Sequence, residues 1–405
     1  MIKAGRGEWT DKQILDALHG VNGSIEVAFR FDVLKDGIRD RSVSAEGSVT
    51  LNRFADIQRT ARFAFDEPLD WLKEEVKPYM LLCMGNPVSE GFEYETWDAR
   101  DALNYTFDEW DALALTWDML DNNKEKRWAE FPLGVFILST PKRSSKNART
   151  SWSVEAYDRT VILQEDSLTE PLLITAGTKY LDAIESVLVS AGITRIVVTE
   201  PVNTQIPADR VFEIGTKKLS VVNSLLNEIN YNPIYCDADG AFIISPYVAP
   251  SAAQVSYTYK ADHMSIIGRD TESELDYYNV PNVFIAICSN PDLEQDYVSV
   301  WINDNPASKL STIQRGRRIV SEIYQPDAIA SQAALDKYIG RIAFEANQVY
   351  KQLIFKTALN PLHERAEVLS LQHPDATGVY VESSWTIPLS ADGEMTHHVR
   401  RLVVI

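Results

Sequence analysis

Apolar and polar side chains alternate along residues 24–65, which is the pattern of strands that bury one face. Successive side chains of a strand point to opposite faces of a sheet, so the alternation predicts antiparallel strands against a core. The apolar positions are Ile25, Val27, Phe29, Phe31, Val33, Val49, Leu51, Ala61, Phe63 and Phe65. We expect further strands at Tyr79–Cys83, Pro132–Ser139 and Trp152–Tyr157, with Lys142–Thr150 as a polar hairpin loop. Residues 23–166 are therefore predicted to form a β-barrel domain, preceded by an N-terminal arm of residues 1–22.

Residues 90–130 stand apart from this alternation and are predicted to be an insertion in the barrel. They contain twelve acidic and four basic residues, and the dipeptide Trp-Asp occurs three times. Carboxylates are ligands for Ca²⁺, and tryptophan rings can stack on sugars. We favour the simpler interpretation, an acidic surface loop held by its own tryptophans. The candidate interaction residues are Trp97, Asp98, Trp110, Asp111, Trp117 and Asp118.

An internal repeat marks the next segment. The Gly-Thr-Lys of residues 177–179 recurs at residues 215–217, and apolar residues at helical spacing follow each copy. The pattern predicts two short amphipathic helices with Thr178 and Thr216 as N-caps. The spacing of a phosphate-binding loop is missing. After the second helix, the turn residues 237–240 close a predicted hairpin, so residues 167–260 are expected to form a small α/β domain.

Strand patterns return at Val283–Cys288, Tyr297–Ile302, Glu367–Leu371, Val379–Leu389 and Met395–Ile405. Between the first two and the last three, apolar residues at helical spacing predict a helix from about Ser331 to Tyr350. The simplest arrangement is a second β-barrel over residues 261–405 with a helical insertion at about 325–355. The predicted fold class is α+β, mainly β.

Composition limits the possible partners. The 405 residues carry a formal net charge of −19, which disfavours a grip on nucleic acid because phosphate binding needs clustered Lys and Arg. The sequence has no run of 18 apolar residues and no apolar segment of signal-peptide type near its start, so we expect no membrane span. Cys83, Cys236 and Cys288 are far apart and lie mostly in apolar runs, which favours buried free thiols.

Catalytic and metal-binding patterns are weak. The sequence has no Gly-x-Ser-x-Gly elbow, and the 58 acidic residues make chance carboxylate pairs inevitable. His397 and His398 are neighbours on a predicted strand and should point to opposite faces, and the spacing of His363 and His373 fits no zinc motif. We therefore expect surface or hydrogen-bonded core histidines and predict neither a catalytic site, nor a metal site, nor a cofactor.

One basic cluster stands out in this acidic chain. Arg315, Arg317 and Arg318 fall within four residues. They are candidates for contact with an acidic patch on a neighbouring subunit, or they cap a helix, or they lie in solvent.

The order of elements, a β-barrel, an α/β insert and a second β-barrel with a helix, resembles the central baseplate or tail-tip hub proteins of phage tails and contractile injection systems. Members from phages of Gram-positive hosts share similar stretches. These are residues 131–141, 154–158, 176–182, 279–282, 303–307, 342–346 and 382–388.

The resemblance implies two tube-type β-barrel domains per chain and a homotrimer. Six such domains would form a pseudo-sixfold ring that adapts the hexameric tail tube to a threefold tip and lets DNA pass. The expected partners are the tail-tube or distal-tail ring and other tail-tip or baseplate proteins, in a virion tail assembled in the host cytoplasm.

In related proteins this module is often the N-terminal part of a longer tail-associated lysin. Because the chain stops at Ile405, directly after its last predicted strand, we expect no lytic domain and no enzymatic activity. The alternatives are a carbohydrate-binding receptor module that uses Trp97, Trp110 and Trp117, and a cell-wall hydrolase with its site in the α/β region.

Overall fold

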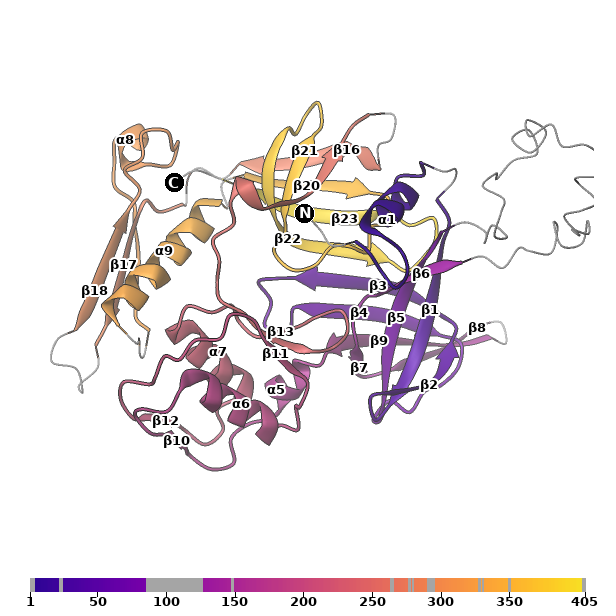
Figure 1. Cartoon of the computed structure of the whole chain (residues 1–405), viewed down its shortest axis with the longest axis horizontal. Helices are drawn as coiled ribbons and strands as arrows, with labels where there is room; N and C mark the ends of the chain where they lie inside the picture. Colours follow the sequence, from indigo (N-terminus) through magenta and orange to yellow (C-terminus); the bar gives the residue numbers. More distant parts are fainter. Residues whose placement is uncertain are drawn as a thin grey trace, which may run out of the picture.

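The computed structural model describes residues 4–21, 25–84, 127–146, 149–262, 266–275, 278, 280–289, 296–326, 329, 331–348 and 351–402. Its largest element is one 15-stranded sheet, in which the longest path of pairing runs β16-β20-β23-β22-β3-β4-β9-β7-β5-β1-β2. The chain therefore has the mainly β, α+β fold that the sequence predicts. Figure 1 shows the yellow C-terminal strands beside the indigo and violet N-terminal strands.

The first half of this sheet contains β1 (Val27–Lys35), β2 (Ile38–Val43), β3 (Ala45–Asn52), β4 (Arg59–Phe65), β5 (Glu74–Cys83), β6 (Trp128–Pro132), β7 (Phe136–Leu138), β8 (Lys142–Lys146) and β9 (Arg149–Asp158). The second half contains β15 (Val255–Lys260), β16 (Ile267–Leu275), β20 (Lys351–Thr357), β21 (Val368–Gln372), β22 (Gly378–Pro388) and β23 (Met395–Arg401). Among these strands the pairing is an open path, and closure of each half into a barrel stays a prediction.

The two halves repeat one strand order. In the first half β3, β4, β9 and β8 are neighbours in that order, and in the second half β16, β20, β23 and β22 are. The registers agree: Phe63 of β4 pairs with Val154 of β9, and Phe355 of β20 pairs with His397 of β23. β7 also pairs with both β9 and β5, as β22 pairs with both β23 and β21. Segment β7–β8 is thus the counterpart of β22.

The halves meet where β22 pairs antiparallel with β3. Thr386 lies opposite Thr50 in this seam, and the two hydroxyl oxygens are 2.9 Å apart. Nearby, Gly47 of β3 has no room for a side chain, because a Cβ there would lie 1.8 Å from the Arg62 carbonyl oxygen. The seam makes one continuous sheet of two segments that are more than 300 residues apart in sequence.

The N-terminal segment includes a helix that the alternation did not predict. α1 (Asp11–Leu18) begins at a capping box, in which Thr10 accepts from the backbone of Gln13 and the Gln13 side chain accepts from that of Thr10. Ile14 and Leu18 are buried in the core of the first half. The segment is therefore packed on the sheet, as Figure 1 shows.

The α/β insert contains α5 (Val161–Glu165), β10 (Leu172–Ile174), α6 (Tyr180–Ser190), β11 (Ile196–Val198), β12 (Arg210–Phe212), α7 (Lys218–Glu228), β13 (Tyr235–Cys236) and β14 (Phe242–Ile244). Both predicted helices are present, but the predicted N-caps are wrong. The caps are Lys179 and Lys217, one residue later, and neither makes a side-chain capping bond. Gly177 and Gly215 adopt φ values of 83° and 84°, so each copy makes the same turn before its helix begins.

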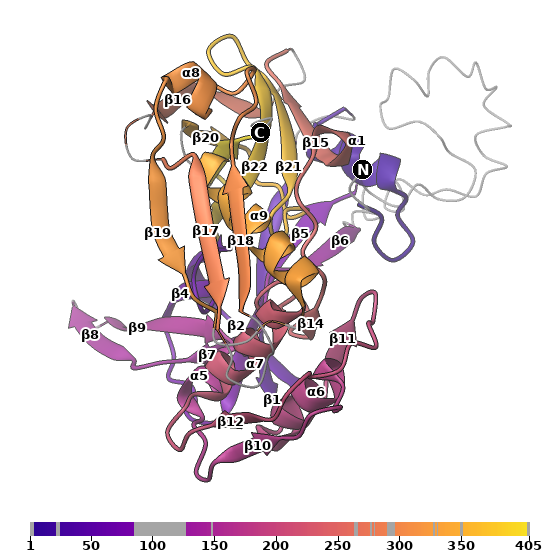
Figure 2. The same ribbon diagram turned by 90° about the vertical axis from the view of Figure 1, so that its left-hand side faces the viewer.

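A third unit contains β17 (Val283–Cys288), β18 (Tyr297–Ile302), α8 (Thr312–Arg315), β19 (Val320–Tyr324) and α9 (Gln332–Gln348), while the short helix η1 (Ala252–Gln254) directly precedes β15 of the large sheet. The helix predicted near residues 331–350 is confirmed as α9. The assignment of Val283–Cys288 and Tyr297–Ile302 to a barrel sheet is wrong, since they form a separate three-stranded sheet with β19. Apolar alternation indicates a buried strand, but it does not indicate which strands pair with it. α9 packs against one face of this sheet, and in Figure 2 the sheet lies in front of α9.

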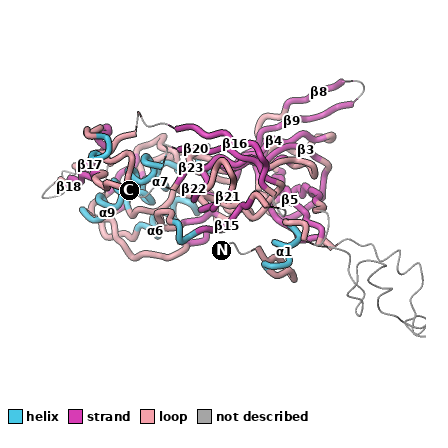
Figure 3. The backbone as a smooth tube through the Cα atoms, turned by 90° about the horizontal axis from the view of Figure 1, so that it is seen from above, coloured by secondary structure: helices cyan, strands magenta, loops and turns pink. Residues whose placement is uncertain are grey.

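Two further sequence predictions need correction. The single strand expected at Pro132–Ser139 is divided into β6 and β7, because Gly134 adopts φ 138° between them. The residues expected as a hairpin loop are largely strand, since Lys142–Lys146 pairs with Arg149–Ser153 of β9. This β8–β9 hairpin projects from the body of the molecule in Figure 3.

Candidate functional site

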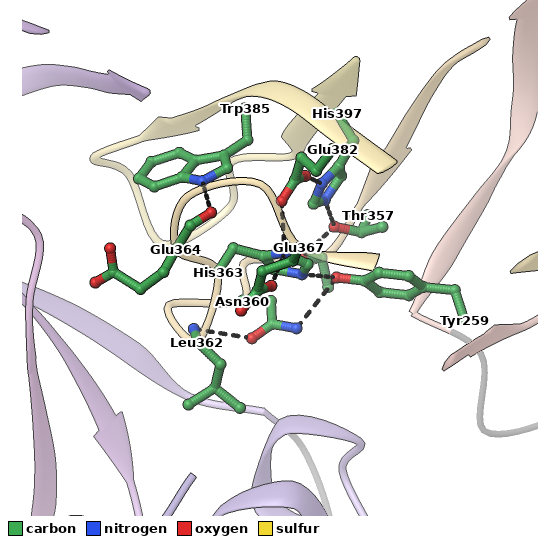
Figure 4. A network of polar contacts seen from close by, with 11 residues as sticks. Tyr259, Thr357, Asn360, Leu362, His363, Glu364, Glu367, Glu382, Trp385 and His397 are labelled. Atoms are coloured by element: carbon green, nitrogen blue, oxygen red, sulfur yellow. Dashed lines mark hydrogen bonds and ion pairs between the residues drawn. The ribbon is translucent and has the colours of Figure 1, made fainter. Parts of the chain in front are cut away.

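A buried network of polar side chains lies in the second half of the sheet, close to the seam (Figure 4). Tyr259 comes from β15, Glu382 from β22 and His397 from β23, while His363 lies in the loop between β20 and β21. None of these four residues is more than 2% exposed. Five separate stretches of sequence therefore meet here, counting Thr357 at the end of β20.

Glu382 is the centre of the network and bonds both histidines. Its Oε1 is 2.6 Å from Nδ1 of His397, and its Oε2 is 2.9 Å from Nδ1 of His363. The other ring nitrogens are also bonded: His363 Nε2 is 2.6 Å from the Tyr259 hydroxyl, and His397 Nε2 is 2.9 Å from the Thr357 hydroxyl. Each imidazole thus has a partner on both sides.

A second carboxylate enters the network from the loop. Oε2 of Glu367 lies 3.0 Å from Nδ1 of His363, so this ring nitrogen faces two carboxylates. Asn360, in the same loop, donates to the Tyr259 hydroxyl over 3.1 Å. The loop is thereby held against the interior of the second half.

Burial and charge act in opposite directions on these groups. Burial alone would lower the pKa of His363, but the oxygens of Tyr259, Glu382 and Glu367 outweigh it and hold the pKa well above its usual range. Burial alone would raise the pKa of Glu382, yet His363 and His397 bring it down to about 2. Burial lowers the pKa of His397. The arrangement favours a protonated His363 beside an ionised Glu382, with a neutral His397.

Among the described residues, His363, Glu382 and His397 form a group whose ligand atoms lie within 4.8 Å of one another, close enough to hold a metal ion. The contacts between them are of hydrogen-bond length, and the outer ring nitrogens bond to hydroxyl groups. The geometry is that of a hydrogen-bonded core network, which fixes the packing of four strands and a loop. The expectation of hydrogen-bonded core histidines is confirmed for His363 and His397.

The same loop crosses to the first half of the sheet. Glu364 accepts from the buried Arg59 of β4 over 2.6 Å, and its carbonyl oxygen accepts from the Trp385 indole over 3.4 Å. Arg365 donates to the side chain of Gln58 over 2.8 Å. Residues 358–367 therefore join the polar network to the seam and fix the relative position of the halves.

The predicted basic cluster lies at a helix end. Arg315 is in the last turn of α8 and donates to the Val280 carbonyl over 2.9 Å, while Arg317 and Arg318 are exposed before β19. Beside them, the outer face of the β17–β19 sheet exposes about half of Val300 and of Ile323. An interaction role for Arg315, Arg317 and Arg318 stays a prediction.

The other predicted interaction residues, Trp97, Asp98, Trp110, Asp111, Trp117 and Asp118, lie outside the described residues. His397 and His398 do point to opposite faces, one buried and one exposed. Cys236 and Cys288 are buried free thiols as predicted, whereas Cys83 is half-buried.

Sequence reasoning missed the network itself. The one sequence signal for the network is a polar residue at an inward position of an alternating strand. His397 is such a residue, because it lies between the buried Met395 and Val399 on the same face of β23. Nothing in the sequence pairs that histidine with Glu382 or with a loop residue. The tertiary structure alone brings them together.

Comparison with known proteins gives a consistent fold. A scan of protein-family models and a search of curated proteins each find no match. Three solved structures are similar over nearly the whole chain. The tail protein from Neisseria meningitidis MC58 has a TM-score of 0.60 at 12% identity and covers 92% of this chain and 97% of its own. The 43 kDa tail protein of prophage MuSo2 from Shewanella oneidensis has 0.56 at 9% identity, with 92% and 98% covered.

The third similar structure is prophage tail protein gp18 from Listeria monocytogenes EGD-e, with a TM-score of 0.50 at 9% identity and coverage of 93% and 94%. The resemblance expected from the sequence is therefore confirmed at the level of the fold: this chain has the fold of phage tail proteins. Each helix in the described part is too short or too polar to cross a bilayer.

Proposed function

We propose that this chain is a structural hub at the distal end of a phage-type tail. Three copies form a closed ring that continues the tail tube and lets DNA pass. The observation that carries the proposal is the repeat of one strand order in the two halves of the chain. Three chains with two equivalent halves supply six modules, the number that a hexameric tube ring presents.

The seam between β22 and β3 supports this symmetry. It joins the two halves edge to edge through backbone pairing, with Ser384–Pro388 opposite Ser48–Asn52. A ring of equivalent modules needs one such contact between each pair of neighbours. The fold shared with tail proteins supports a position in a virion tail, where the tube ring and other tail-tip or baseplate proteins would be its partners.

The charge of the chain suits a channel for DNA. A formal net charge of −19 repels phosphates, so an acidic lumen would let DNA slide without sticking. A structure of the assembled ring with a basic lumen would contradict this part of the proposal.

Assembly with the tube protein tests the hub. We expect a complex of three 45.6 kDa chains by light scattering, and a ring with an open centre by negative-stain microscopy. The trimer is expected either alone or on the tube ring, since tail proteins can assemble on a partner. A chain that stays monomeric even with the tube protein would overturn the proposed ring, and cleavage of cell-wall material by that monomer would favour a hydrolase.

A further inference from the structure

Among the described residues, several strands of the large sheet pair on one side only, and two of these edge strands, β8 and β16, occupy defined places in the repeat. β8 is the outer strand of the series β3-β4-β9-β8, and β16 is the outer strand of the series β16-β20-β23-β22. Unpaired edges present free N–H and C=O groups that can pair with another chain. β8 occupies the place of β22, and β16 that of β3.

That correspondence predicts which strand each of these two edge strands should pair with. β22 pairs with β3 inside the chain, so its counterpart β8 should pair with the counterpart of β3 in the next module. The counterpart of β3 is β16. We propose that β8 of one copy pairs antiparallel with β16 of a second copy, and that this contact closes the trimer. The inference rests on the proposed ring and names the surfaces that form it.

The register of the contact follows from the existing pairs. The pair Val381–Arg400 in the second half corresponds to the pair Ile137–Tyr157 in the first half. Thr386 lies five residues beyond Val381, and Lys142 lies five residues beyond Ile137. Thr386 and Lys142 therefore occupy corresponding positions. Gly47 pairs with Phe63, and Thr271 pairs with Phe355. Thr50 and Glu274 each lie three residues beyond these partners, so they also occupy corresponding positions. Thr386 lies opposite Thr50 in the seam. In the contact between copies, Lys142 should therefore lie opposite Glu274.

The charges of the edges agree with this register. Lys142 and Arg143 of β8 are exposed, and so are Asp270, Glu272 and Glu274 of β16. Side chains directly opposite each other in an antiparallel pair have Cβ atoms about 5 Å apart, so Lys142 and Glu274 would form an ion pair. A neutral threonine pair joins the halves inside the chain, and a charged pair would take its place between copies.

The shape of the hairpin fits a contact with another molecule. The β8–β9 hairpin extends beyond the body of the chain in Figure 3, and β8 has no second strand partner among the described residues. β16 pairs with β20 on one side, and the described part of the chain offers no strand on its other side. Each copy thus offers a projecting basic edge and an acidic edge, which is the head-to-tail arrangement of a ring.

Charge reversal tests the contact. Lys142→Glu or Glu274→Lys alone should raise the dissociation constant of the trimer, or of its complex on the tube ring, by at least about tenfold. The combination of the two should recover most of the wild-type affinity, because the ion pair is restored with opposite polarity. Sedimentation velocity measures the assembly. Because both residues are exposed, unchanged thermal unfolding of the monomer serves as the folding control.

Matched variants check the register. Arg143→Glu has the same charge change on the opposite face of β8, where the expected partner is Ser273, so it should weaken assembly far less. Glu185→Lys on the exposed surface of α6 is the control for Glu274→Lys. A Lys142→Cys/Glu274→Cys chain should form a disulfide between copies under mild oxidation. β8 and β16 lie at opposite ends of eight consecutive strands, so this bond cannot form within one chain.

Two results overturn the inference, and they differ. If the wild-type chain forms the trimer but neither reversal weakens it and the cysteines do not cross-link, the edges are not the contact, and the hub stands. If the wild-type chain stays monomeric even with the tube protein, the proposed ring fails, and the edge contact fails with it.

Discussion

The two halves of the sheet share a strand order but have different interiors. In the first half the inward positions hold Leu138 and Val154, which pack among phenylalanine rings. The corresponding positions of the second half hold Glu382 and His397. The fold therefore needs inward side chains of suitable size, and either apolar packing or a satisfied polar network can supply them.

The connecting loops show the same contrast. Between β4 and β5 the chain buries Leu69 and packs Trp71 against the core, whereas between β20 and β21 it inserts His363. Apolar groups pack in many arrangements of similar energy, but a hydrogen bond requires a defined partner and direction. The polar half is thus the one that fixes the loop of residues 358–367 against the seam.

The largest expected effect comes from making the second half resemble the first at one position. Glu382→Leu removes the partner of both histidines and leaves buried polar nitrogens unpaired, so we expect a loss of about 3–5 kcal/mol in unfolding free energy. Urea unfolding followed by tryptophan fluorescence measures it.

A fully apolar replacement sharpens this comparison. The variant Glu382→Leu/His397→Val/His363→Leu/Glu367→Leu removes the carboxylates and imidazoles of the network together, including the Glu367 group that faces His363, and should recover at least half of the loss. If the unfolding free energy of Glu382→Leu alone stays within about 1 kcal/mol of the wild-type value, the network does not stabilise the second half.

The second-largest effect is expected in the pH dependence of the unfolding free energy, to which the polar network of the second half contributes. The pKa of Glu382 falls from 4.5 to about 2 in the folded chain, so its contribution is complete above pH 4.5 and is lost as the pH falls toward 2. The lowering corresponds to roughly 3 kcal/mol. In urea unfolding between pH 5 and 2, the stability difference between the wild type and Glu382→Gln should shrink steadily. A constant difference would contradict an ionised Glu382.

The smallest effect is expected at the seam. Thr386→Val keeps the shape of the side chain but removes its bond to the Thr50 hydroxyl, which should cost about 0.5–1 kcal/mol. Thr50→Val is the matched variant, and the double variant should cost little more than either single one, because both lose the same bond. Thermal unfolding of the three proteins measures this coupling. Additive losses would show that the two hydroxyls act independently.

The sequence predicted most of the strands that bury one face, but it missed the central strand β20 and several strands at the edges. β4 and β22 were found because their buried positions alternate or nearly alternate. β16 was missed because most of its residues are exposed on both faces, and β8 was read as a loop for the same reason. Apolar alternation indicates contact with a core, and an edge strand that is exposed on both faces has little such contact.

The candidate site was less predictable than the fold. The sequence correctly separated His397 from His398, since their directions depend only on strand geometry. It gave no reason to join His363 to Glu382, which lie 19 residues apart in a loop and a strand. Such a contact depends on how strands pair across the whole sheet, and local periodicity does not indicate which strands pair.

The seam also sets an order of events during synthesis. β3 is complete once residue 52 leaves the ribosome, but its partner β22 ends at residue 388. At translation rates of about 5–20 residues per second, one edge of β3 waits on the order of twenty seconds to a minute for its partner. The first half must therefore persist during that time with an unprotected edge.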